Sequence, residues 1–167
     1  NFYNLNKANL TRKTNEPQAF VVSGGQPNNE TIARFIEILM WQGIEVFEMT
    51  EELYLAHNSN KRNDFHEMPL GSFMIFTNQT QKNNILSLFE KQVYPNRVNA
   101  NGEAETPYDV AGWTLPLQMG IETDEVWNIR DLENAKKTLK KVENINEARK
   151  TLNLTPNKNP FDKMENP

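Results

Sequence analysis

The stretch from Phe20 to Met49 restricts the fold more than any other part of this sequence. It begins with the β-branched and aromatic run Phe20–Val22, closed by Gly24 and Gly25, which is typical of a buried strand followed by a tight loop. Apolar residues then recur at helical spacing on one face: Ile32, Phe35, Ile36, Leu39 and Met40. Gly43 is placed to end this helix in a left-handed conformation. Residues 44–49 mix apolar residues with Glu45 and Glu48, as a strand near a sheet edge does, and so complete a strand, a helix and a strand.

Two strands joined by one helix form a βαβ unit, whose right-handed crossover makes the strands parallel. Phe73–Phe76 has the composition of a further strand, and the segment after it carries Ile85, Leu88 and Phe89 on one helical stripe. We therefore expect an α/β fold with a mostly parallel sheet and helices on both of its faces.

The two ends of the chain differ from this middle part. Residues 1–17 are polar and aperiodic, which predicts a linker or extended lead-in. Asp131 can cap a helix with a stripe of Leu132, Ala135, Leu139 and Val142, and 145–152 indicates a second, so that 131–154 is predicted as C-terminal helices. Prolines, asparagines and lysines dominate 155–167, which predicts a disordered tail.

Three stretches, in the same order, resemble one known kind of domain. They are Ala19–Gln26 with the helix-like run after it to Val46, Pro69–Phe76 continuing to Pro95, and Pro107–Glu122, which reads PYDVAGWTLPLQMGIE. Together they resemble the module that follows the peptidase domain in bacterial zinc carboxypeptidase-like proteins of the M14 family, a module similar to class I glutamine amidotransferases.

This resemblance implies a fold, a parent protein and a location. The fold would be a flavodoxin-like three-layer sandwich with a mostly parallel sheet, formed by residues 18–130. The parent would be an exported, periplasmic or cell-surface zinc carboxypeptidase that removes C-terminal residues from peptides. Its zinc would lie in the upstream peptidase domain, which would be the partner of this domain. The chain starts at Asn1 without an initiator Met or a leader, as expected for a piece of a longer protein.

The residues that such chemistry needs are not found in the sequence. Family carboxypeptidases hold zinc with a His-x-x-Glu pair and a distant His, but Asn60 stands three residues after His57 and Pro69 three after His66. The chain has no cysteine, so it lacks the nucleophile of a glutamine amidotransferase. Ser23 lies beside Gly24, where a turn explains it better than a Gly-x-Ser-x-Gly elbow.

Ser72 follows Gly71 and is interpreted in the same way. His57 and His66, with Asp64 and Glu67 close by in the sequence, are interpreted as surface residues of a polar loop. We therefore predict no catalytic residue, no metal site and no cofactor in this chain.

Two groups of residues could still bind something. Gly24, Gly25 and Gln26 follow a strand and precede a helix, where backbone N–H groups can face an anion or another small ligand. Tyr108 and Trp113 lie in a proline-bounded segment and could dock against another domain.

The overall charge excludes some partners. With 18 basic and 22 acidic residues the net charge is −4, so no positive field attracts nucleic acid. No apolar run approaches the roughly 18 residues that a membrane-spanning helix needs.

We expect a non-catalytic accessory or structural domain of a zinc carboxypeptidase, which packs against the peptidase domain, limits substrate access or forms a homo-oligomer contact. The alternative is a small-molecule or glycan-binding module that uses Gly24–Gln26. A hydrolase that uses Ser23 as its nucleophile is a third hypothesis.

Overall fold

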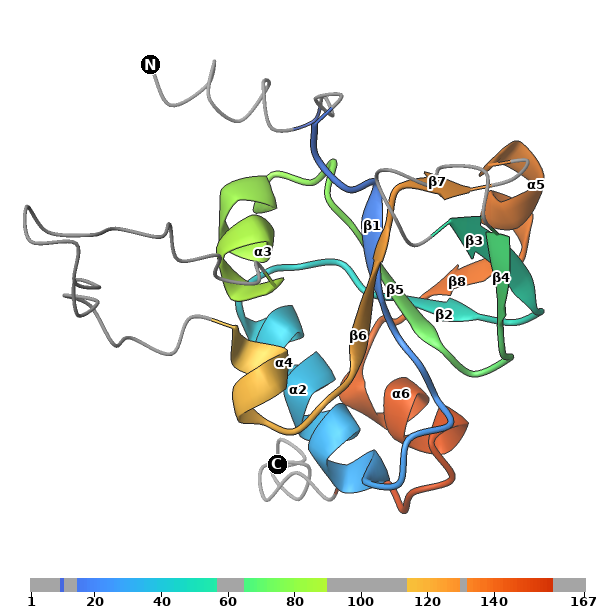
Figure 1. Ribbon diagram of the computed structural model, residues 1–167. Helices are drawn as coiled ribbons and strands as arrows, with labels where there is room; N and C mark the ends of the chain where they lie inside the picture. Colours follow the sequence, from blue (N-terminus) through green and yellow to red (C-terminus); the bar gives the residue numbers. More distant parts are fainter. Residues whose placement is uncertain (1–9, 11–14, 57–64, 90–113, 130–131, 158–167) are drawn as a thin grey trace, which may run out of the picture.

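A five-stranded antiparallel sheet lies at the centre of the structure, a computed structural model that describes residues 10, 15–56, 65–89, 114–129 and 132–157 (Figure 1). Its strands follow the order β6-β1-β5-β2-β8. Their bounds are β1 Ala19–Val22, β2 Phe47–Met49, β5 Phe73–Phe76, β6 Thr123–Val126 and β8 Leu139–Lys141.

The mostly parallel, flavodoxin-like sheet predicted from the sequence is wrong. Strand β5 pairs antiparallel with β1, placing Ala19 opposite Phe76, and antiparallel with β2, placing Phe47 opposite Met74. Strands β1 and β2 therefore run in the same direction, as their βαβ pattern requires, but β5 lies between them. A crossover helix fixes the relative direction of the two strands that it joins and not whether they are neighbours.

The order of elements along the chain explains this arrangement. Strand, helix, strand, strand, helix and strand follow one another as β1, α2, β2, β5, α3 and β6, where α2 is Asn29–Trp41 and α3 is Lys82–Phe89. With the spatial order β6-β1-β5-β2, this is the topology of a split βαβ, or ferredoxin-like, sheet. Strand β8 extends the sheet beyond β2, and a β3–β4 hairpin is inserted between β2 and β5.

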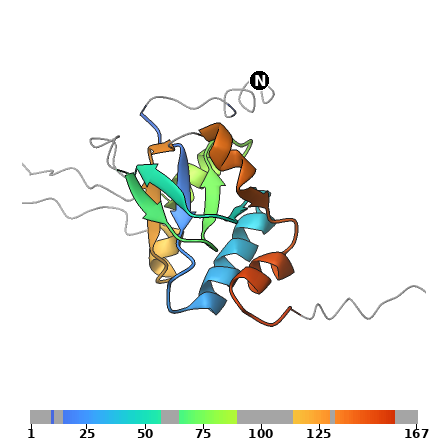
Figure 2. The same cartoon turned by 90° about the vertical axis from the view of Figure 1, so that its right-hand side faces the viewer.

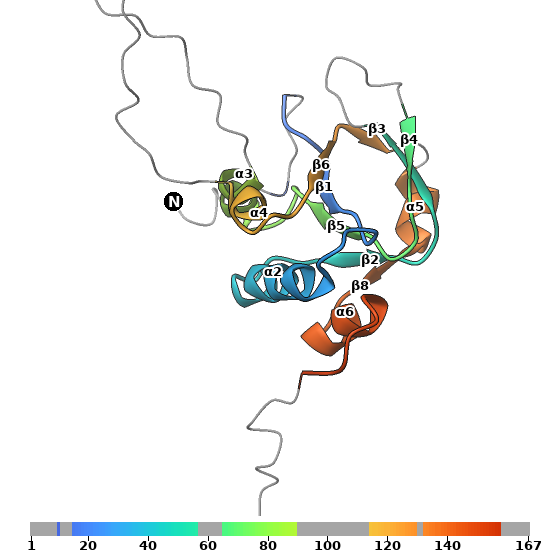
Figure 3. The same ribbon diagram turned by 60° about the horizontal axis from the view of Figure 1, so that its bottom comes forward.

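One face of the central sheet is covered by helices. They are α2, α3 and two shorter ones, α4 Leu115–Gln118 and α6 Ile145–Thr151 (Figure 3). Phe20 and Val22 of β1 point into this layer with Phe73 and Ile75 of β5. They meet the buried side of α2, formed by Ile32, Ala33, Phe35, Ile36 and Leu39.

A second, three-stranded sheet covers the opposite face, where helices were expected. Its order is β4-β3-β7, and it packs with helix α5 on this side of the molecule (Figure 2). The bounds are β3 Leu53–Ala56, β4 Phe65–Met68, β7 Asn128–Ile129 and α5 Leu132–Lys137. Ala19, Val21 and Met74 face this layer. Strands β1 and β5 are therefore buried on both faces, which accounts for their continuous apolar sequences.

The predicted helix after the first strand is confirmed, with both of its ends. The Asn28 side chain accepts a hydrogen bond from the Thr31 N–H at 3.2 Å and so caps α2. Gly43 has a φ of 73°. Its N–H donates to the Met40 carbonyl, and the Ile44 N–H donates to the Leu39 carbonyl. This pattern is a Schellman motif, which needs the left-handed residue that glycine supplies.

The helices predicted over 131–154 are interrupted by a strand. Helix α5 ends at Lys137, and β8 pairs with β2, with Leu139 opposite Met49. Flanking bonds extend this pairing, from the Thr50 N–H to the Thr138 carbonyl and from the Val142 N–H to the Val46 carbonyl. The exposed ladder groups of β2 thus decide the conformation of a segment whose apolar spacing also fits a helix.

The segment before β1 also makes defined contacts. The Lys82 ammonium lies 2.5 Å from the Glu16 carboxylate and is buried. The Thr77 hydroxyl donates to the Pro17 carbonyl at 2.8 Å. Parts of the predicted lead-in, 1–17, therefore pack on the domain.

Two glutamine side chains replace missing backbone partners. The Gln79 amide oxygen accepts from the Glu45 N–H at 2.7 Å, and its NH2 group donates to the carbonyls of Glu45 and Phe76 at 2.8 and 2.9 Å. The Gln26 side chain does the same at the other end of the sheet. It accepts from the Glu122 N–H at 2.8 Å and donates to the Glu122 carbonyl at 2.9 Å. We call these two contacts the glutamine clamps.

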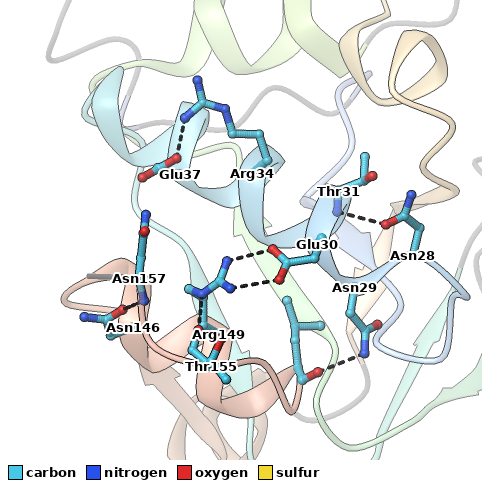
Figure 4. A network of polar contacts seen from close by, with 11 residues as sticks. Asn28, Asn29, Glu30, Thr31, Arg34, Glu37, Asn146, Arg149, Thr155 and Asn157 are labelled. Atoms are coloured by element: carbon cyan, nitrogen blue, oxygen red, sulfur yellow. Dashed lines mark hydrogen bonds and ion pairs between the residues drawn. The ribbon is translucent and has the colours of Figure 1, made fainter. Parts of the chain in front are cut away.

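The C-terminal part of the chain is fastened to α2 by a set of polar contacts, the α2–α6 clasp (Figure 4). The Arg149 guanidinium donates two hydrogen bonds to the Glu30 carboxylate, at 2.8 and 2.9 Å, and a third to the Thr155 carbonyl. The Asn29 NH2 group donates to the Leu152 carbonyl at 2.8 Å. Part of the predicted tail, 155–167, is therefore held in place up to Asn157, whose N–H donates to the Asn146 side chain.

Replacing the clamp glutamines should cost different amounts of stability. Gln79 is only 7 % exposed, so Gln79→Ala leaves backbone groups of Glu45 without partners and should lower the free energy of unfolding by about 2–4 kcal/mol. Gln26→Ala removes equivalent hydrogen bonds, but at a position where water can bind the freed backbone groups. It should therefore lower the free energy of unfolding by only about 1 kcal/mol. Urea unfolding of both variants measures the difference. Equal costs would mean that burial does not set the strength of the clamps.

The α2–α6 clasp should make the free energy of unfolding depend on pH. Hydrogen bonds from Arg149 lower the pKa of the Glu30 carboxyl below its usual value of 4.5. A lowered pKa in the folded state stabilises the protein above the usual pKa, and this contribution is lost as the pH falls through the lowered value. Wild type should therefore exceed Glu30→Gln in unfolding free energy at pH 7, and the difference should shrink between about pH 5 and pH 3.

Chemical unfolding across this pH range measures the difference. Glu51→Gln, which removes an exposed carboxylate outside the clasp, is the control and should show no such trend. A constant gap between wild type and Glu30→Gln would contradict the role given to the ion pair.

Candidate functional site

The loop predicted to bind a ligand lies between β1 and α2 and is held by hydrogen bonds within the chain. The Gly24 N–H donates to the Ser72 hydroxyl at 3.3 Å, and the Gly25 N–H donates to the Ser23 hydroxyl at 3.4 Å. The Gln26 side chain forms the clamp with Glu122. The N–H groups of Gly24 and Gly25, two of the donors that would face an anion, thus already have acceptors. The ligand-binding role of Gly24, Gly25 and Gln26 stays a prediction.

Close packing against a neighbouring turn explains why glycine stands at position 24. A Cβ atom on Gly24 would lie 2.4 Å from the Gly71 carbonyl oxygen, a backbone atom that has little freedom to move. At Gly25 the nearest atom to such a Cβ is the Ser23 hydroxyl, at 3.9 Å. Only the first glycine is therefore required by the contact between this loop and the β4–β5 turn.

The two serines considered as nucleophiles have structural partners. Ser72 is fully buried, and its hydroxyl donates to the Pro69 carbonyl at 2.8 Å while accepting from Gly24. Ser23 accepts from Gly25. Within the described part of the chain, neither hydroxyl is hydrogen-bonded to a histidine or a carboxylate. This arrangement lacks the base that would activate a serine for attack.

His66, the histidine among the described residues, belongs to no cluster of possible metal ligands in the ranges that the structure covers. His66 is exposed on β4, opposite Leu55 of β3. His57 and Asp64 lie outside the described residues. No group of three His, Asp or Glu side chains suited to a metal ion occurs among the residues described.

Tyr108 and Trp113, the predicted docking residues, also lie outside the described residues. The chain re-enters the described structure directly after Trp113, at Thr114, the residue before helix α4. Helices α3 and α4 and the C-terminal end of α2 occupy the same end of the helical layer (Figures 1 and 3). The Asn84 side chain on α3 donates to the Gln42 side chain just beyond α2, which links these helices.

Two large apolar side chains on these helices are exposed. Trp41, the last residue of α2, is 68 % exposed, and Leu117 on α4 is 76 % exposed. We call them the helix-end surface. The Arg34 guanidinium lies 4.6 Å from the centre of the Trp41 ring and also pairs with Glu37. One face of the indole is therefore supported by a cation within the same helix.

Neither residue was predicted from the sequence to bind a partner, although the sequence carries a signal for Trp41. Trp41 lies off the apolar stripe of α2, whose buried members end at Leu39. A large aromatic residue off the buried face of an amphipathic helix is a candidate for contact with another molecule.

A cavity of about 400 Å³ opens between the central sheet and helix α5. Strands β2 and β5, the residues that flank them, and the α5–β8 segment all contribute to it. Its lining consists of Gln18, Glu45, Phe47, Phe76, Asn78, Gln79, Leu132, Lys136 and Leu139. We call it the α5 pocket. It combines residues from widely separated parts of the sequence, so no local motif could have revealed it.

Comparison with protein-family models, with curated proteins and with solved structures finds no match. Among the described helices, none combines the length and the apolar character needed to cross a membrane.

Alanine substitutions should separate the two glycines of the loop. Gly24→Ala places a methyl group against the Gly71 carbonyl and should lower the free energy of unfolding by about 1–3 kcal/mol or more. Gly25→Ala meets no close atom and should leave stability within about 1 kcal/mol of wild type. Thermal and urea unfolding of the two variants measure this. Equal destabilisation by both substitutions would contradict the close-packing explanation.

Proposed function

We propose that this chain is a non-catalytic accessory domain of a zinc-dependent carboxypeptidase of the M14 family. The resemblance of Ala19–Gln26, Pro69–Phe76 and Pro107–Glu122 to the module that follows the peptidase domain in that family supports the parentage. The observation that carries the accessory role is the helix-end surface, where Trp41 and Leu117 expose apolar side chains. Its partner in this proposal is the peptidase domain of the same polypeptide.

The chemistry of the helix-end surface suits protein docking. Tryptophan and arginine are enriched among the residues that contribute most to binding at protein interfaces. The contact with Arg34 supports the Trp41 ring, so less side-chain entropy is lost on docking. Tyr108 and Trp113, predicted from the sequence to dock, precede α4 along the chain and lie outside the described residues.

The polar groups at the positions considered for catalysis favour a structural role as well. The Ser72 hydroxyl joins the β4–β5 turn to the loop after β1, and Gln26 joins that loop to the segment before β6. In this proposal the zinc ligands and the catalytic base belong to the upstream peptidase domain, and the parent is exported to the periplasm or the cell surface. The domain packs on the peptidase domain and limits substrate access, or contributes a contact between copies.

A charge placed on the helix-end surface should weaken docking. Trp41→Lys combined with Leu117→Lys should reduce the affinity for the purified peptidase domain, encoded in the same reading frame, by about tenfold or more, because both side chains would leave an apolar interface. Leu70→Lys is the matched control, since Leu70 is 62 % exposed on the β4–β5 turn, outside this surface. Calorimetric titration measures the affinities.

Two results would overturn the proposal. Unchanged binding by the double variant would remove the helix-end surface from the interface. A reading frame that encodes no His-x-x-Glu pair with a distant His upstream of this domain would remove the zinc carboxypeptidase parent.

A further inference from the structure

Four large apolar side chains form a wall of the α5 pocket, and all of them are half-buried: Phe47, Phe76, Leu132 and Leu139. Phe76 and the two leucines also pack against the apolar core on this side of the central sheet. The rings of Phe47 and Phe76 meet edge to face, with their centres 5.5 Å apart. Because protein interiors are normally close-packed, a cavity of about 400 Å³ beside these side chains is unusual, and it falls in the size range of known small-molecule sites.

The charged groups that line the pocket are exposed and already engaged. Glu45 and Lys136 are exposed side chains and therefore border its opening. The Glu45 carboxylate pairs with the Lys141 ammonium at 2.5 Å, and Lys136 also has a contact within the chain. A charged ligand would lose its water on entering an apolar cavity and would gain no free counter-ion there, which is unfavourable. The pocket therefore favours a neutral ligand.

Two glutamines of the lining differ in what they can offer to such a ligand. Gln79 is buried, and its side chain makes three hydrogen bonds to backbone groups of Glu45 and Phe76. Gln18 is half-buried, and its side-chain amide forms no hydrogen bond or ion pair within the described part of the chain. A side-chain amide can both donate and accept hydrogen bonds. Gln18 can therefore bind a hydroxyl group, whose oxygen also donates and accepts.

An apolar wall, a neutral interior and one half-buried amide together select a ligand chemistry. We infer that the α5 pocket binds a small, neutral phenol. Its ring contacts Phe47, Phe76 and the two leucines, and its hydroxyl group shares a hydrogen bond with the Gln18 amide. Aromatic rings prefer offset-stacked and edge-to-face contacts, and the inclined pair of phenylalanines offers a surface for either. The apolar contacts supply most of the affinity, and the hydrogen bond orients the ligand.

The inference is independent of the proposed accessory role, because the α5 pocket and the helix-end surface have no residue in common. Failure of either therefore leaves the other standing, and the pocket can be tested without a peptidase domain.

The probe 4-methylphenol is suitable because it is neutral at pH 7 and joins an aromatic ring to a hydroxyl group. Titration into the chain labelled at its leucine methyl groups should shift the signals of Leu132 and Leu139 and give a saturable dissociation constant of about 1 mM or tighter. The charged counterparts 4-methylbenzoate and 4-methylbenzylammonium should each bind at least about fivefold more weakly, because the pocket offers neither charge a free partner.

A pair of variants tests the role assigned to Gln18. Gln18→Leu keeps the approximate size of the side chain but removes the hydrogen bond, and should weaken 4-methylphenol binding by about fivefold. Toluene, which lacks the hydroxyl group, should bind this variant at least as well as it binds wild type. Gln118→Leu, which changes an exposed glutamine of α4 outside the pocket, is the matched control and should leave both affinities unchanged.

A larger side chain tests the position of the ligand. Leu132→Trp should fill the pocket and abolish the shift of the Leu139 methyl signals. The unfolding curve of this variant shows whether it is folded, and the comparisons of probes and of Gln18→Leu do not depend on it.

Three outcomes would overturn the inference: no saturable shift of Leu132 or Leu139 with about 10 mM 4-methylphenol, weaker than millimolar binding; equal affinity for 4-methylphenol and its two charged counterparts; or equal affinity of Gln18→Leu and Gln118→Leu for 4-methylphenol.

Discussion

The insertion of β5 between β1 and β2 is the constraint on which the rest of the structure depends. Because of it, neighbouring strands pair antiparallel, whereas the sequence predicted parallel pairing. Strands β1 and β5 are buried on both faces. Because successive side chains of a strand point to opposite faces, Phe20 and Val22 join the helical layer while Ala19 and Val21 join the second sheet. One strand pair thus unites two apolar clusters, and the layers on either side are held together through it.

Polar side chains complete the hydrogen bonding where the sheets end. Gln79 and Gln26 each pair with both backbone groups of one distant residue, which is what a neighbouring strand would otherwise do. Ser72 joins two turns in the same manner. Groups that looked like candidates for chemistry in the sequence are therefore part of the framework. The surface that we propose for docking, around Trp41, contains none of these framework residues.

Local signals in the sequence predicted local structure well. The cap at Asn28, the apolar stripe and the left-handed Gly43 each act within a few residues, and the helix that they define is confirmed. The position of β5 depends on pairing between segments that lie far apart in the sequence. No spacing of residues in the sequence indicates which strands will pair. Strand β8 was missed because Leu139 fits a helical stripe as well as a strand, and only the free edge of β2 decides between them. The glutamine clamps and the α5 pocket have no periodic signal, whereas Trp41 could have been noticed as an aromatic residue outside the apolar stripe.

Strand β1 is made long before the second of its two sheet neighbours. Ala19 lies opposite Phe76 on one side and Val126 on the other, so β1 emerges from the ribosome long before its second neighbour exists. The contact between Glu30 and Arg149 spans 119 positions and comes later still. A nascent chain therefore carries one unpaired edge of β1 until β6 has been made, and unpaired strand edges are prone to aggregation.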